Sequence, residues 1–271
     1  MSVPYDLVPT ARLSGIHMTG TVVRRFLISY PVSPDILSCH LPPGAECATH
    51  DGFAWVSACF VRMDDMRPNI LPRFVGMGFN YLIHRTRARL PFPDGKLREA
   101  VLVLQPNINR PLLSSFGSLL TGVGFRNRQI DFTEDEDNWR IRMISQGELL
   151  YDAEISKSSC SESITTESRF TTVPEADKFL LGVSFGGQWV KGQKNLKLLP
   201  ETHDPWTTRA CTCTTHKNQF LESLGVDAID ADHAITMTQI PHYFGITPIK
   251  TTLKCATEAD TSLNRSGGVD A

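Results

Sequence analysis

The 271-residue sequence has no long apolar run, no excess of charge of either sign and no secretory signal. None of its apolar stretches approaches the roughly 18 residues that a membrane-spanning helix needs. The formal net charge is -2, and positive charge is not clustered as a nucleic-acid surface requires. Residues 1–10 carry no basic segment followed by an apolar one. We therefore predict a cytoplasmic protein with no membrane or nucleic-acid partner.

Cysteine is present, but not in the pattern of a disulfide framework. The seven cysteines are odd in number and irregularly spaced in a long chain. Cys211, Cys213 and His216 lie close together in the segment CTCTTH and superficially suggest zinc. Structural zinc sites usually separate their cysteines by about two to four residues, and the gap here is shorter. We predict neither a metal site nor another cofactor, and interpret this cluster as coincidental packing.

Strand patterns dominate the rest of the chain. Residues 21–30 (TVVRRFLISY) are β-branched and aromatic, which favours a strand. Residues 53–63 (FAWVSACFVRM) are almost continuously apolar, which is typical of a central strand covered on both faces. Further strands are predicted at residues 80–90, 99–104, 125–132, 139–144, 148–155 and 233–240, with another hairpin at 182–197. Such a succession of hairpins predicts an antiparallel sheet that is closed or nearly closed around a core.

Helix signals are few. Ser33 can cap a short helix in which Pro34 occupies the first position. The clearest helix is predicted over residues 111–124, where apolar residues recur at helical spacing and glycines lie near the end. Short helices are also predicted at residues 175–181 and 218–224.

Two longer segments and one short motif resemble the acetoacetate decarboxylase superfamily. Residues 30–63 contain YPVSP, then LPPG, then DGFAWVSACFVRM. They are similar to the opening of an uncharacterised bacterial branch, in which a helix ends in a Leu-Pro-Pro-Gly loop and a Trp-bearing strand follows. Residues 116–130 resemble the segment that carries a helix and active-site residues in the superfamily. Residues 203–206 (HDPW) resemble a late His-x-Pro-Trp of the same branch.

The resemblance implies a mainly β (α+β) fold, namely an acetoacetate decarboxylase-like antiparallel β barrel or cone with a few helices. It covers about residues 21–240. We expect one domain over residues 21–255, preceded by an extension at 1–20. Residues 256–271 are small and polar and are predicted to form a disordered tail.

The resemblance also implies that the decarboxylase chemistry is missing. In true acetoacetate decarboxylases, a Gly/Ala-aromatic-Pro-Lys-Lys segment supplies a lysine that forms a Schiff base with the keto group. Residues 124–128 here read GFRNR, which puts Asn127 at the lysine position. An amide nitrogen is not a nucleophile, and the neighbouring arginines stay protonated. The acidic residue of the family would fall near Asn80 or Tyr81, and neither is acidic.

The matched segment predicts which residues face the ligand. Strand alternation places Phe125, Asn127 and Gln129 on one face, and Arg126 and Arg128 on the other. The family position requires the Asn127 face to point inward, which leaves the two arginines at the exterior or rim. A guanidinium there could still hold a carboxylate.

Arg85 shares one strand face with Arg87 and Arg89 and aligns with an arginine of the uncharacterised relatives. The complete set of candidate ligand-binding residues is Asn127, Gln129, Phe125, Arg126, Arg128, Arg85, Asn80 and Tyr81.

Three functional hypotheses remain open, of which the third is a scaffold role in an oligomer. The first is a small-molecule-binding barrel for a carbonyl or carboxylate compound, acting as a lyase, hydratase or isomerase without a Schiff-base lysine. The second is a non-catalytic protein that binds or sequesters small apolar or aromatic compounds. An acidic or histidine side chain in the interior would favour catalysis, and a purely apolar interior would favour binding alone. Whether the protein forms a homo-oligomer is left open.

Overall fold

The computed structural model describes residues 15–115, 123–164, 168–226, 230–246 and 248–253. Most of its elements are strands, in a 12-stranded and a 4-stranded sheet. The larger sheet contains β1 (His17–Val32), β2 (Glu46–Cys47), β3 (Thr49–His50), β4 (Phe53–Pro68), β5 (Met77–Pro91), β6 (Leu97–Ile108), β7 (Arg126–Asn127), β11 (Phe185–Gln188), β12 (Asn195–His203), β13 (Arg209–Cys211), β15 (His233–Gly245) and β16 (Ile249–Thr252). The smaller sheet contains β8 (Gln129–Glu134), β9 (Asn138–Ser145), β10 (Glu148–Ser156) and β14 (Cys213–Asn218).

The helices are short and few, as predicted. They are α1 (Pro34–Ser38), the 3-10 turn η1 (Arg73–Val75), α3 (Val173–Leu180) and α4 (Gln219–Ser223). Residues 111–115 are also helical, while residues 116–122 of the predicted 111–124 helix lie outside the described residues, as does the predicted tail. Within the described ranges, no helix is long and apolar enough to span a bilayer.

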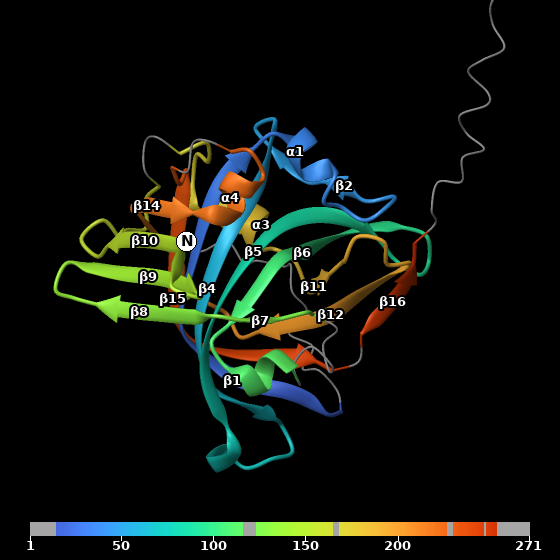
Figure 1. The fold of residues 1–271 in the computed structure, drawn as a ribbon, viewed down its shortest axis with the longest axis horizontal. Helices are drawn as coiled ribbons and strands as arrows, with labels where there is room; N and C mark the ends of the chain where they lie inside the picture. The colour runs from blue at the N-terminus through green and yellow to red at the C-terminus, as the bar shows by residue number, and fades with distance from the viewer. Residues whose placement is uncertain (1–14, 116–122, 165–167, 227–229, 247, 254–271) are drawn as a thin grey trace, which may run out of the picture.

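The larger sheet closes into a ring, which confirms the predicted mainly β barrel (Figure 1). Its strands follow the order β15-β1-β4-β5-β6-β11-β12, and β12 also pairs with β15. The closing pairs are Glu201 with Phe244, Thr202 with Tyr243 and His203 with His242. The ring departs from the predicted all-antiparallel pairing between β6 and β11, which run parallel. Closure brings the C-terminal strands β12 and β15 beside β1 and so completes an interior.

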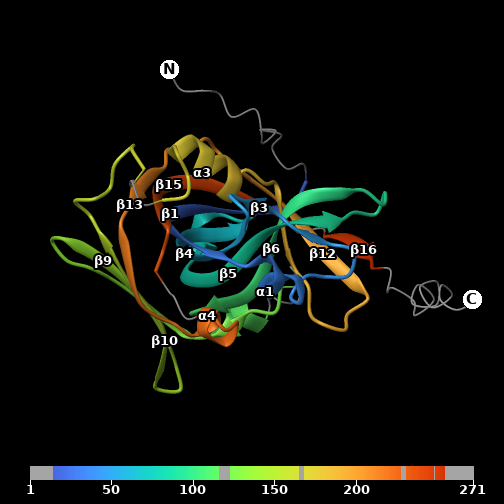
Figure 2. The ribbon, with the colours of Figure 1, turned by 90° about the horizontal axis from the view of Figure 1, so that it is seen from above.

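Alternation along β1 and β4 divides the core between the two faces of this ring. Phe26 and Phe60 face outward and pack against Phe132 and Trp139 of the smaller sheet. The alternate residues of both strands, such as Leu27, face the barrel interior. Figure 2 shows β9 and β10 on one side of the ring and β12 and β16 on the other. Because β4 is covered on both faces, its sequence is almost continuously apolar, as predicted.

Helix α3 covers one end of the barrel interior. Thr172 caps it by accepting a hydrogen bond from the Glu175 amide at 3.2 Å. At its other end, Arg85 Nη2 donates to the Leu180 carbonyl at 3.0 Å and Arg87 Nη1 to the Lys178 carbonyl at 2.6 Å. Two guanidiniums thus satisfy carbonyl groups that the helix leaves without partners.

The strand predicted over residues 125–132 is interrupted. Residues Arg126 and Asn127 pair with β6 in the larger sheet, whereas β8 begins at Gln129 and pairs with β9 in the smaller one. Between them, the Arg128 amide donates to the Ile108 carbonyl at 3.0 Å. The chain changes sheets here, so simple alternation does not hold across this segment.

One disulfide joins Cys160 to Cys211 across 51 residues. It ties the Ser-rich connection after β10 to β13, beside a β-bridge between Ser161 and Ala210. A single bond does not make a framework, but it gives Cys211 a partner that its spacing from Cys213 did not suggest. The Cys213 thiol remains free, and burial raises its pKa to about 12.

A polar network lies between the two sheets. Tyr30 Oη lies 2.8 Å from Thr215 Oγ1, and His84 Nε2 lies 3.0 Å from Asn218 Oδ1. His84 is 1% exposed, and burial lowers its pKa to about 4 despite the hydrogen bond to Asn218. The imidazole is therefore neutral in the folded protein at neutral pH.

This neutral histidine predicts acid sensitivity. The unfolded chain protonates His84 near pH 6.5, whereas the folded protein resists protonation until about pH 4, so the free energy of unfolding should fall as pH drops through this window. The contribution at pH 5 is about 2 kcal/mol. His84→Gln can donate to Asn218 but cannot titrate. Between pH 7.5 and 5, its free energy of unfolding, measured with denaturant, should therefore fall by about 2 kcal/mol less than that of the wild type. His40→Gln, at an exposed position, is the control; equal pH slopes for all three proteins would contradict this prediction.

Candidate functional site

Charged and polar side chains converge inside the barrel where an apolar core would be expected. Arg25 on β1, Tyr81 and Arg85 on β5, Glu201 on β12 and His242 on β15 form this set, named here the interior cluster. Arg25 pairs in register with Val61, which pairs with Tyr81, so these residues lie in one row across three strands. Against the effect of burial, Arg25 and Arg85 lower the pKa of Tyr81, and both arginines also lower that of Glu201. Besides burial, Arg25 and Tyr81 in turn shift the pKa of Arg85, so the cluster behaves as one charged unit.

A carboxylate and an imidazole form the tightest contact of the cluster. His242 Nε2 lies 2.7 Å from Glu201 Oε1. Burial alone would raise the pKa of Glu201, but His242 and the guanidiniums of Arg25 and Arg85 lower it to about 2. Glu201 is therefore ionised at neutral pH, and its side chain keeps 30% of its accessible surface. Among the described residues, no side chain donates to its second oxygen, Oε2.

Two guanidiniums face this single carboxylate. Arg25 is 5% exposed and donates its Nε–H to Cys59 Sγ at 3.4 Å. Burial would lower the pKa of Arg25, but Cys59, Tyr81 and Glu201 raise it above its ordinary value. Within the described ranges, the terminal nitrogens of Arg25 donate to no protein group. Arg85 is 7% exposed, and only its Nη2 has a partner there, the Leu180 carbonyl.

Tyr81 supplies a neutral hydroxyl beside these charges. Burial raises its pKa above the ordinary tyrosine value, and the nearby Cys59 raises it further. Its phenol therefore stays protonated at neutral pH and can donate a hydrogen bond. No described residue pairs with this hydroxyl.

The segment that follows β12 adds an aromatic wall. The rings of His203 and Trp206 stack with centroids 3.3 Å apart, and the Arg25 guanidinium lies 5.6 Å from the Trp206 ring. His203 Nδ1 donates to the Asp204 carbonyl at 2.8 Å, and burial lowers its pKa to about 4. The HDPW motif therefore holds a neutral histidine and a tryptophan against the interior cluster.

Only two of the eight predicted ligand-binding residues, Tyr81 and Arg85, belong to this cluster. Asn80 alternates to the opposite face, where its Nδ2 donates to the Ile130 carbonyl at 3.3 Å. The positions of the other residues bear on the predicted geometry.

The prediction that Asn127 and Gln129 face an enclosed interior is wrong. Both are exposed, as is Arg126, while Phe125 and Arg128 are partly buried. Gln129 Nε2 donates to Asp131 at 2.8 Å, and Arg128 Nη1 donates to the Asn127 carbonyl. The physical reason is the change of sheet at Arg128, after which the buried position falls on Ile130.

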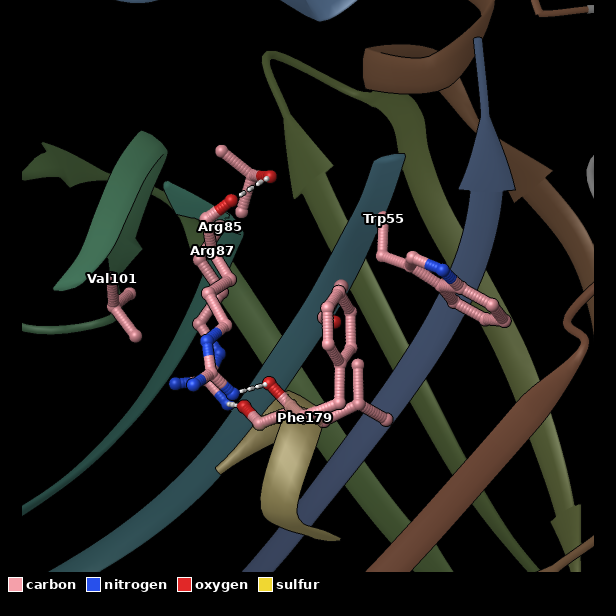
Figure 3. A pocket seen from close by; sticks show the side chains of 8 residues that line it. Trp55, Arg85, Arg87, Val101 and Phe179 are labelled. Carbon is pink, nitrogen blue, oxygen red and sulfur yellow. Dashed lines mark hydrogen bonds between the residues drawn. The ribbon is translucent and has the colours of Figure 1, made fainter. Parts of the chain in front are cut away.

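Two hollows flank the cluster on the α3 side. A surface cleft of about 530 Å³ lies outside the barrel, and its arginines are already paired, Arg89 with Glu46 and Arg87 with Glu99. A void of about 10 Å³ lies farther in, beside Arg85 and Trp55, and has room for a single water (Figure 3). Figure 3 shows Arg85 and Arg87 reaching toward the carbonyl end of α3, near Phe179. Neither hollow is lined by Arg25, Tyr81, Glu201 or His242.

The comparisons with known proteins agree with this architecture. Residues 21–241 match the family model DUF2071, described as an uncharacterized conserved protein. This chain belongs to the DUF2071 family. The resemblance inferred from the LPPG and DGFAWVSACFVRM segments is thus confirmed. No curated protein matches the sequence of this DUF2071 chain.

Solved structures with a similar fold include acetoacetate decarboxylases and an enduracididine biosynthesis enzyme. The enduracididine biosynthesis enzyme MppR complexed with pyruvate aligns with a TM-score of 0.60 at 11% identity, over 89% of this chain and 92% of that one. Acetoacetate decarboxylase from Legionella pneumophila gives 0.58 at 15% identity, over 92% and 94%. An acetoacetate decarboxylase-like enzyme from Sphingomonas wittichii RW1 gives 0.59 at 11% identity, over 94% and 100%. At these identities the likeness establishes the fold of the DUF2071 chain.

Sequence reasoning did not single out Arg25, Glu201 or His242. Arg25 had a usable signal, because an arginine inside the apolar strand 21–30 must occupy one of two buried faces. Glu201 and His242 had none, since each lies in a segment without a distinctive pattern and they meet only because β12 pairs with β15. His203 and Trp206 belong to the HDPW motif, to which the sequence alone assigns no role.

The charge balance of the cluster can be tested by a double-mutant cycle. Glu201→Gln leaves two buried guanidiniums without a counterion, so the free energy of unfolding should fall by about 2–3 kcal/mol at pH 7. Arg25→Met removes one of those guanidiniums, so the double variant should recover about 1 kcal/mol or more relative to the sum of the single changes. Measurement is by urea unfolding.

The exposed pair Glu46 and Arg89 provides the matched control. The same cycle with Glu46→Gln and Arg89→Met should give a coupling of about 0–1 kcal/mol. Strict additivity of the Arg25 and Glu201 changes would show that the two charges do not depend on each other.

Proposed function

We propose that the protein binds a small carboxylate-bearing molecule inside the barrel and exchanges protons with a carbonyl compound there without forming a Schiff base. The observation that carries this proposal is the pair of buried guanidiniums, Arg25 and Arg85, whose charges both act on one carboxylate that is already hydrogen-bonded to His242. A buried charge that has no partner is costly, so one further anion would balance the site. A guanidinium matches a carboxylate with two parallel hydrogen bonds.

Ligand binding would also change the basicity of Glu201. His242 and, to a smaller extent, Arg25 and Arg85 hold the pKa of this carboxylate at about 2 against the effect of burial, which makes it a weak base in the free protein. An anion bound to the two guanidiniums would cancel part of their field and raise the pKa of Glu201. Binding and proton abstraction are then linked, because the base gains strength when the substrate carboxylate is in place.

The other groups have complementary roles. Tyr81, held neutral by burial, would donate to the carbonyl oxygen on which negative charge develops. Glu201 Oε2 would take a proton from the carbon next to that carbonyl, while His242 holds Oε1. Proton transfer next to a carbonyl is the step that lyases, hydratases and isomerases of this kind share.

The positions of the lysines support chemistry without an imine. None of the lysines in the described ranges is buried. Lys157 and Lys217, the least exposed of them, form ion pairs with Glu134 and Glu222. The pyruvate complex of the structurally similar MppR supports a small 2-oxo acid as the first ligand to test.

The alternative, a non-catalytic binding protein for apolar or aromatic compounds, draws support from the wall formed by Trp206 and His203. Ionised and histidine groups in the interior favour the catalytic proposal over it. A cytoplasmic location, a small-molecule ligand as the only class of partner and the open question of a homo-oligomer remain predictions.

Pyruvate binding and exchange test the proposal. Isothermal titration should detect binding that weakens at least about tenfold in Arg25→Met, which loses a charge-assisted hydrogen bond. The matched control is Arg142→Met, an exposed arginine on β9, which should bind as the wild type does. In D₂O, proton NMR should show exchange of the pyruvate methyl hydrogens, lost in Glu201→Gln. Binding without exchange would favour the sequestering alternative, and no binding would refute the proposal.

Reductive trapping tests the prediction that the protein forms no imine with its ligand. Incubation with pyruvate and borohydride should leave the protein mass unchanged, because no buried lysine faces the cluster in the described ranges. A covalent adduct that maps to a lysine would contradict imine-free chemistry even if the binding site proved correct.

A further inference from the structure

Partly exposed aromatic side chains border the interior cluster, and the carboxylate site alone does not account for them. Phe79 and Tyr81 follow each other on the inward face of β5, with ring centroids 6.1 Å apart. Phe244 lies on the inward face of β15, 4.5 Å from the His242 ring. Trp206 stacks on His203. All four large rings, Phe79, Tyr81, Trp206 and Phe244, pack against the interior apolar core while remaining partly accessible.

This border contrasts with the other end of the barrel. Trp55 and Phe170, under α3, are each 1% exposed and have centroids 4.6 Å apart, so that end is filled. Phe179 remains partly accessible at that end and lines the outer cleft, whereas the four rings of the border lie at the end that holds Glu201 and Trp206. A site meant only for a compact aliphatic acid would leave these faces uncovered, at a cost proportional to their apolar area.

The rings are fixed before any ligand binds. His203 is oriented by its 2.8 Å hydrogen bond to the Asp204 carbonyl, and Trp206 lies flat against it. The Arg25 guanidinium lies 5.6 Å from the Trp206 ring, so an anion-binding group and a flat aromatic face are neighbours. A preorganised face of this kind favours a planar partner, because little side-chain freedom is lost when it stacks.

We infer that the ligand is an aryl- or heteroaryl-bearing 2-oxo acid, with its carboxylate on Arg25 and Arg85 and its ring against Trp206. This inference rests on the proposed function, since it takes the same carboxylate site for granted. It adds the specificity: Trp206 selects planar, unsaturated substrates, and the partly exposed rings of Phe79 and Phe244 supply further apolar surface at the same end.

Three acids separate ring recognition from carboxylate recognition. Isothermal titration with pyruvate, phenylpyruvate and 3-cyclohexyl-2-oxopropanoate compares no ring, a flat ring and a puckered ring of similar size. Phenylpyruvate should bind at least about tenfold more tightly than pyruvate, and the cyclohexyl acid should fall between them.

Variants of Trp206 locate the effect. Trp206→Leu should reduce the preference for phenylpyruvate over pyruvate to about threefold or less, with pyruvate affinity nearly unchanged, whereas Trp206→Phe should keep most of the preference. Trp189→Leu is the matched control, because Trp189 packs in a different apolar cluster and donates to the Gln193 carbonyl at 3.1 Å.

The outcomes distinguish aromatic specificity from the carboxylate site itself. Equal affinity of the wild type for pyruvate and phenylpyruvate, both sensitive to Arg25→Met, would overturn the aromatic specificity and leave the carboxylate site standing. Retention of the full preference by Trp206→Leu would also overturn the role of Trp206 without affecting the carboxylate site. Failure of every acid to bind the wild type would overturn the proposed function and this inference together.

Discussion

The electrostatic attraction between the guanidiniums of Arg25 and Arg85 and the carboxylate of Glu201 is the interaction on which the interior of this barrel depends. Arginine and glutamate are rarely buried unless they are paired, because the loss of hydration is large. Here Arg25 and Arg85 are 5% and 7% exposed, and the ionised carboxylate has a pKa of about 2 because of these cations and His242. The excess of positive over negative charge distinguishes the interior from a structural ion pair. It is the physical basis for expecting an anionic ligand.

Closure of the sheet is what brings these charges together. Arg25 lies on the first strand and Glu201 on β12, and β15, which pairs with both, is the single strand between them on that side of the ring. Helix α3 covers the opposite end of the barrel, where Arg85 and Arg87 donate hydrogen bonds to the carbonyl groups of the helix. Both features are long-range, so the charge cluster is a property of the topology and not of any one segment.

Much of the fold was predictable because it depends on local patterns. The apolar run 53–63 became the doubly covered strand β4, and Ser33 caps α1 as predicted. The site was less predictable. Alternation from Phe125 to Gln129 assumes one continuous strand, and the change of sheet at Arg128 breaks it, leaving Asn127 exposed. Tyr81 and Arg85 share one face of the unbroken β5, which strand alternation could have shown, whereas the meeting of Glu201 with His242 required knowledge of the ring closure.

The central claim is that the functional site is the interior cluster and neither the exposed segment around Asn127 nor the outer cleft beside Arg89. A crystal structure of the protein soaked with pyruvate tests this most directly. The account predicts a carboxylate bonded to the free nitrogens of Arg25 and Arg85, with the ligand carbonyl within hydrogen-bond distance of Tyr81 Oη. Ligand density in the outer cleft or at Asn127, with only solvent around Arg25, would contradict it.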